Sequence, residues 1–253
     1  MRHQAANVVM LSLVLAAVGE AQKFEVASIK PGAPGVAKPS MGMIKGRLLA
    51  RNATLRELIL YAYQIPAVQV VGGPSWIDSE RFTIEATAPG VLMTEYRSLL
   101  IALLEERFGL RTRHEAREVP VYELVRIKPD VLGPDLRPST PDCTKRAADG
   151  VPPCRLSSGL QGQIVATGIN WDRIALAKEL VAILGRPVID KSGLTGPVDL
   201  SLKWRDPLVL DGSDANLPTI FTAVEEQLGL KLVPTQGAVD FLVVETAVRP
   251  TPN

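Results

Sequence analysis

The chain has 253 residues, with 28 lysines and arginines, 27 aspartates and glutamates, and a formal net charge of +1. This near balance gives no electrostatic argument for nucleic acid or for an acidic surface as the partner of the whole protein. Aromatic residues make up only 5% of the sequence, which argues against a sugar cleft lined with aromatic rings.

Residues 1–21 have the pattern of a secretory signal peptide. Arg2 supplies a positive charge near the start, residues 8–18 are apolar apart from Ser12, and Gly19-Glu20-Ala21 offers small residues to a signal peptidase. The apolar run is shorter than the roughly 20 residues of a membrane-spanning helix. We therefore expect export to the periplasm or the extracellular space, with no membrane span after cleavage. An uncleaved anchor is the alternative.

Residues 22–128 are predicted to form a first α/β unit. Thr54 and Glu57 have the spacing of a capping box, in which a hydroxyl and a carboxylate satisfy each other's free N–H groups, so a helix is expected to begin there. A second helix is expected from Thr94 to Phe108. Alternating or β-branched runs predict strands at 24–29, 46–52, 68–71, 81–86 and 119–125.

Residues 129–160 are rich in Pro, Gly, Asp and Ser and lack apolar periodicity, so they are predicted to be a linker. Both cysteines, Cys143 and Cys154, lie in this segment. In an exported chain, two cysteines in one loop predict a disulfide. A metal site with two cysteine ligands is the alternative, although no histidine lies nearby.

Residues 161–248 are predicted to form a second α/β unit, followed by a frayed tail at 249–253. Its first helix is expected over 171–184, with Asn170 as the N-cap, and Pro218 is expected in the first turn of its last helix. Strands are expected at 187–189, 198–204 and 238–244, with loops at 190–196 and 206–216.

The two units contain a repeated pattern. Residues 103–111 and 223–231 each read as the end of a helix, a glycine stop and the start of a strand, because glycine takes the left-handed conformation that ends many helices. After these segments we expect a charged connection at 114–118 in the first copy and a turn at 235–237 in the second. Upstream, residues 46–55 align with residues 162–171.

We therefore predict an α+β fold built from two related α/β repeats. Its sheets are expected to be mixed or antiparallel, with helices packed on one face of each. Two copies are too few for a solenoid, so a pair of related units is the expected architecture.

The sequence offers no strong catalytic or metal-binding motif, and we assign no catalytic residue, metal site or cofactor. His114 is the only histidine beyond the expected signal peptide, which excludes sites with several histidine ligands. Two adjacent carboxylate pairs, at 105–106 and 225–226, diverge on their helices and are expected to face solvent. The loop at 190–196 lacks the glycine spacing of a phosphate loop and is expected to be a turn, with an anion cradle as the alternative.

Two surfaces are candidates for binding. Arg111 and Arg113 belong to a local basic patch that also contains Arg107, His114 and Arg117. This patch is either a solvated hairpin or a site for an acidic partner or a cell-wall phosphate. Trp76 follows the Gly72-Gly73-Pro74-Ser75 turn and either packs over it or, if exposed, forms a binding hot spot.

Several segments resemble a family of exported proteins of unknown function that is abundant in soil acidobacteria. The resemblance extends over essentially the whole chain beyond the signal peptide, and the segments that carry it are 24–31, 54–59, 72–76, 104–110, 186–196 and 226–232. The resemblance implies no activity and no catalytic residues. Each repeat is also faintly similar to the short N-terminal domains of secretins and TonB-dependent receptors, which are interaction modules. That second similarity concerns the fold and does not fix the function.

From these observations we expect an exported, non-catalytic binding or scaffold module of the cell envelope. Its partner is expected to be an envelope protein rather than nucleic acid, bound by pairing with an edge strand. An envelope hydrolase is one alternative and requires facing carboxylates or a lysine against a serine. A periplasmic receptor for a small ligand is another and requires an apolar cleft between the two units.

Overall fold

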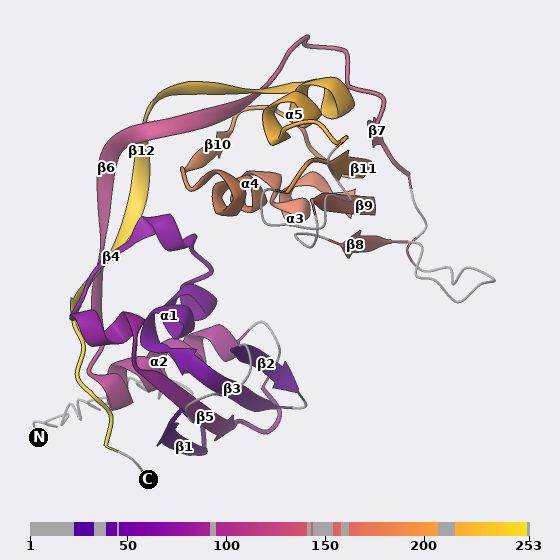
Figure 1. The fold of residues 1–253 in the computed structure, drawn as a ribbon. Helices are drawn as coiled ribbons and strands as arrows, with labels where there is room; N and C mark the ends of the chain where they lie inside the picture. The colour runs from indigo at the N-terminus through magenta and orange to yellow at the C-terminus, as the bar shows by residue number, and fades with distance from the viewer. Residues whose placement is uncertain are drawn as a thin grey trace, which may run out of the picture.

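The computed structural model describes residues 23–32, 39–44, 46–91, 95–140, 143, 154–157, 162–206 and 216–251. The expected signal peptide, Thr94 and most of the loop at 206–216 lie outside these residues. The fold is α+β, with mixed and antiparallel sheets, as the sequence predicts. Figure 1 shows two lobes joined by a long, bent ribbon of two antiparallel strands, β6 and β12, which runs from one lobe to the other. We call this ribbon the hairpin, although the strands and helices of the second lobe lie between β6 and β12 in the sequence.

The first lobe has one antiparallel sheet with the strand order β1-β5-β3-β2. Two helices, α1 (Leu55–Tyr63) and α2 (Tyr96–Phe108), share its core, and two short 3-10 segments, η1 (Ala67–Gln69) and η2 (Ser75–Asp78), follow α1. The strands are β1 (Val26–Pro31), β2 (Ser40–Ile44), β3 (Arg47–Thr54) and β5 (Arg81–Thr87).

The helix ends of the first lobe follow the local signals in the sequence. The hydroxyl of Thr54 accepts the N–H of Glu57 at 3.1 Å, and the Glu57 carboxylate accepts the N–H of Thr54 at 2.8 Å, which confirms the capping box. Gly109 ends α2 in the left-handed conformation, with φ 53°. A Cβ atom there would lie 2.8 Å from a methyl carbon of Val248, so the glycine also lets the C-terminal segment approach.

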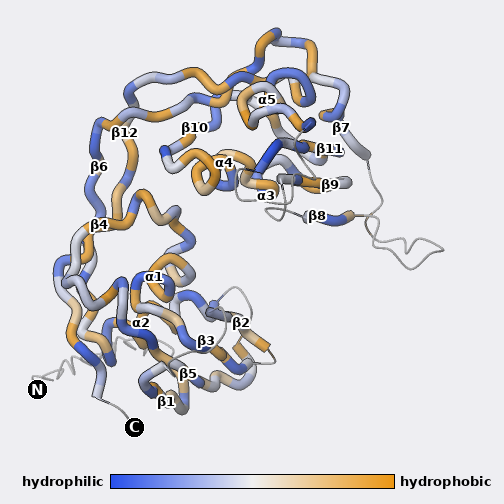
Figure 2. Tube along the Cα trace, in the orientation of Figure 1, coloured by the Kyte–Doolittle hydropathy of each residue, from blue (hydrophilic) through white to orange (hydrophobic). Residues whose placement is uncertain are grey.

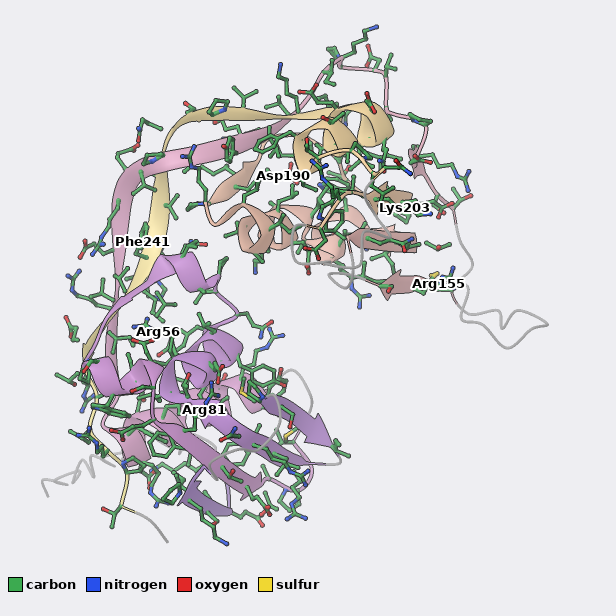
Figure 3. The ribbon with its side chains drawn as sticks, viewed as in Figure 1. Arg56, Arg81, Arg155, Asp190, Lys203 and Phe241 are labelled. Carbon is green, nitrogen blue, oxygen red and sulfur yellow. A yellow bond between two sulfur atoms is a disulfide. The ribbon has the colours of Figure 1, made fainter. Side chains whose placement is uncertain are left out.

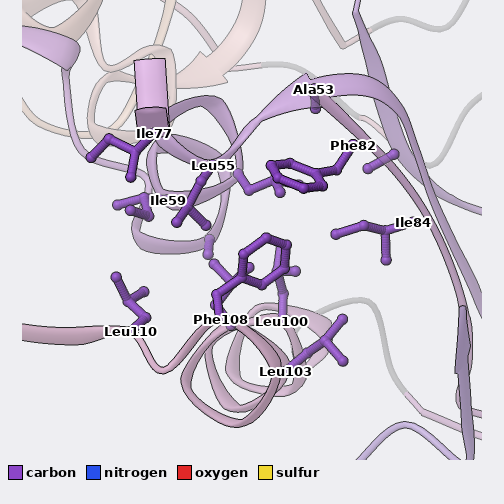
Figure 4. Close-up of a cluster of buried hydrophobic side chains, with 14 of the residues drawn as sticks. Ala53, Leu55, Ile59, Ile77, Phe82, Ile84, Leu100, Leu103, Phe108 and Leu110 are labelled. Atoms are coloured by element: carbon purple, nitrogen blue, oxygen red, sulfur yellow. The ribbon is translucent and has the colours of Figure 1, made fainter. Parts of the chain in front are cut away.

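Aromatic and aliphatic side chains from the sheet and both helices fill the first core (Figure 4). The fully buried ring of Phe108 meets that of Phe82 edge-on, with the ring centres 5.2 Å apart and the planes at 88°. Edge-to-face contacts of this kind add about 0.5–1.5 kcal/mol to the effect of burial. The end of α2 is therefore anchored on the middle of the sheet.

The second lobe is also built on an antiparallel sheet, with the strand order β7-β11-β9-β8. Its strands are β7 (Leu136–Pro138), β8 (Arg155–Ser157), β9 (Gln163–Asn170) and β11 (Pro197–Lys203), and its helices are α3 (Trp171–Ile174), α4 (Leu176–Leu184) and α5 (Ile220–Leu228). The segment predicted as a linker thus contributes both edge strands, β7 and β8. Cys143 and Cys154 within it form the predicted disulfide, with Cα atoms 5.3 Å apart.

Two details of the second lobe correct the sequence-based expectations. The helix expected over 171–184 is interrupted by Ala175, which takes the left-handed conformation with φ 50°, and the Asn170 side chain makes no cap hydrogen bond. In α5, Thr219 caps the helix through the N–H of Thr222, so Pro218 precedes the cap instead of occupying the first turn.

A third sheet joins the two lobes, with the strand order β10-β6-β12-β4. The long strands β6 (Arg111–Arg126) and β12 (Leu230–Thr246) pair antiparallel along almost their whole length. Each is flanked by a short parallel strand from the other half of the chain: β4 (Val70–Gly72) pairs with β12, and β10 (Val188–Asp190) pairs with β6. The two halves are therefore interlocked through this shared sheet.

The length of these strands overturns two expectations. The predicted connection at 114–118 and the predicted turn at 235–237 are both continuous strand in β6 and β12. In the second segment the glycine is required by packing, because a Cβ atom at Gly237 would lie 3.0 Å from Ile189 and 3.1 Å from Val121. This glycine allows close packing of β10 on the hairpin and does not make a turn.

Both lobes pack on the same face of the hairpin. At one end Leu242 and Val244 enter the first core, and at the other Leu124, Leu230 and Leu232 enter the second. The order strand, helix, short strand, strand, helix, long strand occurs in β3 to β6 and again in β9 to β12, with α3 and α4 together in the place of α1. The descent of the two halves from one repeat stays a prediction.

Candidate binding surfaces

The outer edge of β6 is open over most of its length. On that side β10 pairs only with the stretch Tyr122–Leu124. Among the described residues, no strand pairs with the outer edge between Arg111 and Val121. Figure 2 shows that this half of the strand is largely hydrophilic.

The direction of the main-chain groups at this edge follows from one hydrogen bond. The N–H of Tyr122 donates to the carbonyl of Pro187 at 2.9 Å, so it points away from β12. Successive residues of a strand alternate in direction, so the N–H groups of His114, Ala116 and Glu118 point outward as well. Pro120 falls in the same series, where a missing N–H costs the β6–β12 ladder nothing.

Arg111 and Arg113 lie at the start of this open edge, and both are exposed. The guanidinium of Arg113 pairs with Glu115 and, at 3.1 Å, with Glu245. Hydrogen bonds from Arg117 and Arg113 lower the pKa of the Glu115 carboxyl. The predicted basic patch is therefore a mixed row of charges along the strand.

His114 and Arg107, the other members of the predicted patch, have partners elsewhere. The Nδ1 atom of His114 lies 2.5 Å from a carboxylate oxygen of Asp240 on the neighbouring strand. Arg107 belongs to α2 and donates to the main-chain oxygen of Thr251 at 3.2 Å. Neither side chain therefore extends a continuous positive surface along β6.

The structure places Trp76 in η2, where its side chain is only 8% exposed. The turn that carries it is held by Arg56 of α1 (labelled in Figure 3), which pairs with Asp78 and donates to the main-chain oxygens of Val70 and Gly72, each at 3.1 Å. The guanidinium of Arg249 covers the indole ring, 5.4 Å from its centre. Direct contact of a partner with Trp76 would require Arg249 to move.

The loop at 190–196 is an internally satisfied turn. One carboxylate oxygen of Asp190 accepts the indole N–H of Trp171 at 2.6 Å, and the other accepts the N–H of Ser192 at 2.8 Å (Asp190 is labelled in Figure 3). Arg126 donates to the main-chain oxygens of Ser192 and Gly193. These contacts tie the loop to α3 and β6, which gives its polar residues a structural role.

A shallow cavity of about 210 Å³ on the second sheet includes two carboxylates, Asp135 and Asp199. Burial disfavours the charged form of Asp199, but hydrogen bonds from the Gly168 N–H, Ser139 and Arg137 outweigh it and lower its pKa. Because this carboxyl is held ionised, it is suited to act as a fixed acceptor and poorly suited to donate a proton. The geometry therefore gives little support to an acid–base pair at this place.

Among the described residues, no group of three or more His, Cys, Asp and Glu side chains has the arrangement of a metal site. None of the helices in that part of the chain has both the length and the apolar character needed to cross a membrane.

Comparison with known proteins identifies the family. The model of one protein family, DUF3738, described as a protein of unknown function, matches residues 56–247. No curated protein and no solved structure matches the chain. The matched region runs from the first turn of α1 to the end of β12 and so contains the whole interlocked hairpin. The chain belongs to the DUF3738 family.

Proposed function

We propose that this protein is an exported, non-catalytic binding module of the bacterial cell envelope, which captures a protein partner by adding a strand of that partner to the outer edge of β6. The observation that carries the proposal is the open edge between Arg111 and Val121. A strand added there would take up the outward N–H and C=O groups that β12 does not use.

The charged side chains along this edge favour selective pairing with one partner strand. A long unpaired strand is a risk for aggregation, and charged side chains are a common protection. Here Arg113, Glu115 and Arg117 alternate in charge along one face of the strand. A partner strand with the complementary order of charges would pair in one register, because like charges directly opposite each other are unfavourable.

The remaining sequence-based assignments fit this proposal as follows. Arg111 and Arg113 would contact one end of the bound strand, whereas Trp76 would contribute only after displacement of Arg249. The disulfide between Cys143 and Cys154 supports export, because such bonds persist in oxidising compartments. An origin in soil acidobacteria and a similarity to secretin and TonB-receptor domains stay predictions.

The proposal is tested by proline substitution on the two edges of the same hairpin. Ala116→Pro removes an outward N–H from β6, and Ala238→Pro makes the same change on β12, whose residue 238 lies opposite Glu118. Both alanines are exposed, and the outward-facing Pro120 and Pro234 show that each strand accommodates proline at such positions. The two variants are therefore matched in chemistry and in their expected effect on folding.

Each variant is used to recover partners from native envelopes, with the double charge reversal Arg111→Glu and Arg113→Glu as a third arm. We expect a specific partner that is lost with Ala116→Pro, weakened by the charge reversal and kept with Ala238→Pro. In the complex, amide exchange at His114, Ala116 and Glu118 should slow. Equal loss in both proline variants, or no change of exchange at these amides, would refute strand addition at β6.

A further inference from the structure

A groove of about 450 Å³ lies between the two lobes. One wall is the end of α1 and the segment after it, including Leu60, Ile65 and Val68, and the other is α4, including Lys178, Val181 and Ala182. Figure 1 shows α1 and α4 on the same side of the bent hairpin, one in each lobe. The volume falls within the roughly 300–1,000 Å³ of small-molecule sites.

The walls of the groove are mainly apolar, with Gln64 and Lys178 as the polar side chains among the lining residues. Val68 is 36% exposed and is one of the few exposed large apolar side chains in the described part of the chain. Val181, only 3% exposed, also lines the groove. Covering such surface gains about 25 cal/mol for each Å² removed from water. A hydrocarbon chain would supply this cover without hydrogen-bonding groups that need partners.

The groove has one charged side chain among the residues that line it, Lys178. Its ammonium donates to the main-chain oxygen of Gln64 across the groove, with a long separation of 3.4 Å. An ammonium group has three N–H donors, so two remain for a ligand. Because Gln64 follows the carbonyl end of α1, an anion would be accepted on the side of Lys178 that faces away from this residue.

We propose that the groove binds a single-chain amphiphile with a carboxylate head, of the fatty-acid class. The hydrocarbon chain lies between the two lobes against Leu60, Val68 and Val181, and the carboxylate pairs with the ammonium of Lys178. This inference is independent of strand addition at β6, which uses other residues on a different side of the hairpin.

The test is calorimetric titration of the purified chain with monomeric laurate, below its micellar concentration. Dodecyltrimethylammonium, which has the same chain length and the opposite charge, is the matched probe. We expect saturable binding of one laurate and at least about tenfold weaker binding of the cation, the difference that a charge-assisted hydrogen bond supports. Vesicles of phosphatidylglycerol form a second arm, which separates a free amphiphile from a membrane surface.

Three substitutions locate the site. Lys178→Met keeps the stem and removes the charge, and we expect it to weaken laurate binding about tenfold. Lys178→Arg keeps the charge and should bind laurate within about threefold of the original chain, since the head group is recognised by charge. Lys191→Met removes an exposed lysine outside the groove and should change nothing. Ala182→Trp fills the groove from an exposed position and should abolish binding.

Several results would overturn the proposal: no saturable laurate binding, equal affinity for the cationic probe, an unchanged affinity in Lys178→Met, or binding to vesicles without binding of monomeric laurate. Circular dichroism and the thermal midpoint of each variant check its folding. If Ala182→Trp does not fold, the comparison of Lys178→Met with Lys178→Arg decides alone. Laurate binding that survives in Ala116→Pro separates this site from the proposed strand-docking edge.

Discussion

Arg249 in the C-terminal segment lies over the indole ring of Trp76, and Glu80 holds it there. The Nε atom of Arg249 lies 3.0 Å from each carboxylate oxygen of Glu80, and a terminal nitrogen lies 2.6 Å from one of them. The neighbouring N–H of Val248 donates to the carbonyl of Phe108 at 2.7 Å. Residues 249–253 are predicted to be a frayed tail. These contacts, together with the one between Arg107 and Thr251, hold the segment against the first lobe as far as Thr251.

Replacing Arg249 by alanine is expected to uncover Trp76. Trp171 and Trp204 are buried in the core of the second lobe, so a change of acrylamide quenching on substitution of Arg249 reports on Trp76. We expect stronger quenching in Arg249→Ala and an intermediate value in Arg249→Lys, which keeps the charge but not the planar fork. The thermal midpoint should change little, because the ion pair is solvent-exposed. Unchanged quenching would mean that other groups cover the indole.

The contact of Arg249 with Trp76 is expected to depend on pH, because Arg249 is paired with Glu80. Hydrogen bonds from Arg249 lower the pKa of Glu80, so the contact is fully present above the ordinary glutamate pKa of about 4.3 and is lost as the pH falls through the lower folded-state value. We expect quenching to stay constant from neutral pH to about pH 4 and to rise below it. Glu80→Gln should be quenched more strongly at neutral pH and lack this transition. Circular dichroism must show that the fold persists over the range measured.

The features that the sequence predicts well depend on neighbours in the chain. Each of these features is set within a few residues, so its pattern can be recognised in the sequence alone. They include the capping box of Thr54 and Glu57, the glycines that end α2 and α5, and the alternation in β11. The disulfide is also a short-range feature, because its two cysteines are separated by 11 positions in the sequence.

The features that the sequence misses depend on pairing between distant segments. Residues 114–118 and 235–237 are polar or rich in turn-forming types. They become strand because 114–118 pairs with residues 238–242 of β12, and 235–237 pairs with residues 119–121 of β6. The interlobe groove has no sequence signature either. Lys178 reads as an ordinary exposed helix residue, and its position opposite Gln64 follows from how the hairpin brings the two lobes together.

Asp190 is expected to be a main stabilising residue of the second lobe. Its removal leaves the buried indole N–H of Trp171 without its acceptor and releases the turn at Ser192. We expect Asp190→Ala to lower the free energy of unfolding by about 1–3 kcal/mol, measured by urea denaturation. Asp190→Asn keeps one oxygen acceptor and should cost less. If the alanine and asparagine variants are equally stable, the hydrogen bond to Trp171 contributes little.

Replacing Ala175 by glycine is expected to stabilise the second lobe. It holds the left-handed conformation at the junction of α3 and α4, which costs an alanine about 1–2 kcal/mol and a glycine almost nothing. Part of this gain is offset by the greater freedom of glycine in the unfolded chain, so we expect Ala175→Gly to raise the free energy of unfolding by about 0.5–1 kcal/mol. Ala177→Gly, two residues later inside α4, is the control and should lower it by about 1 kcal/mol. A destabilised Ala175→Gly would indicate that the methyl group packs in the native state and that the junction is not strained.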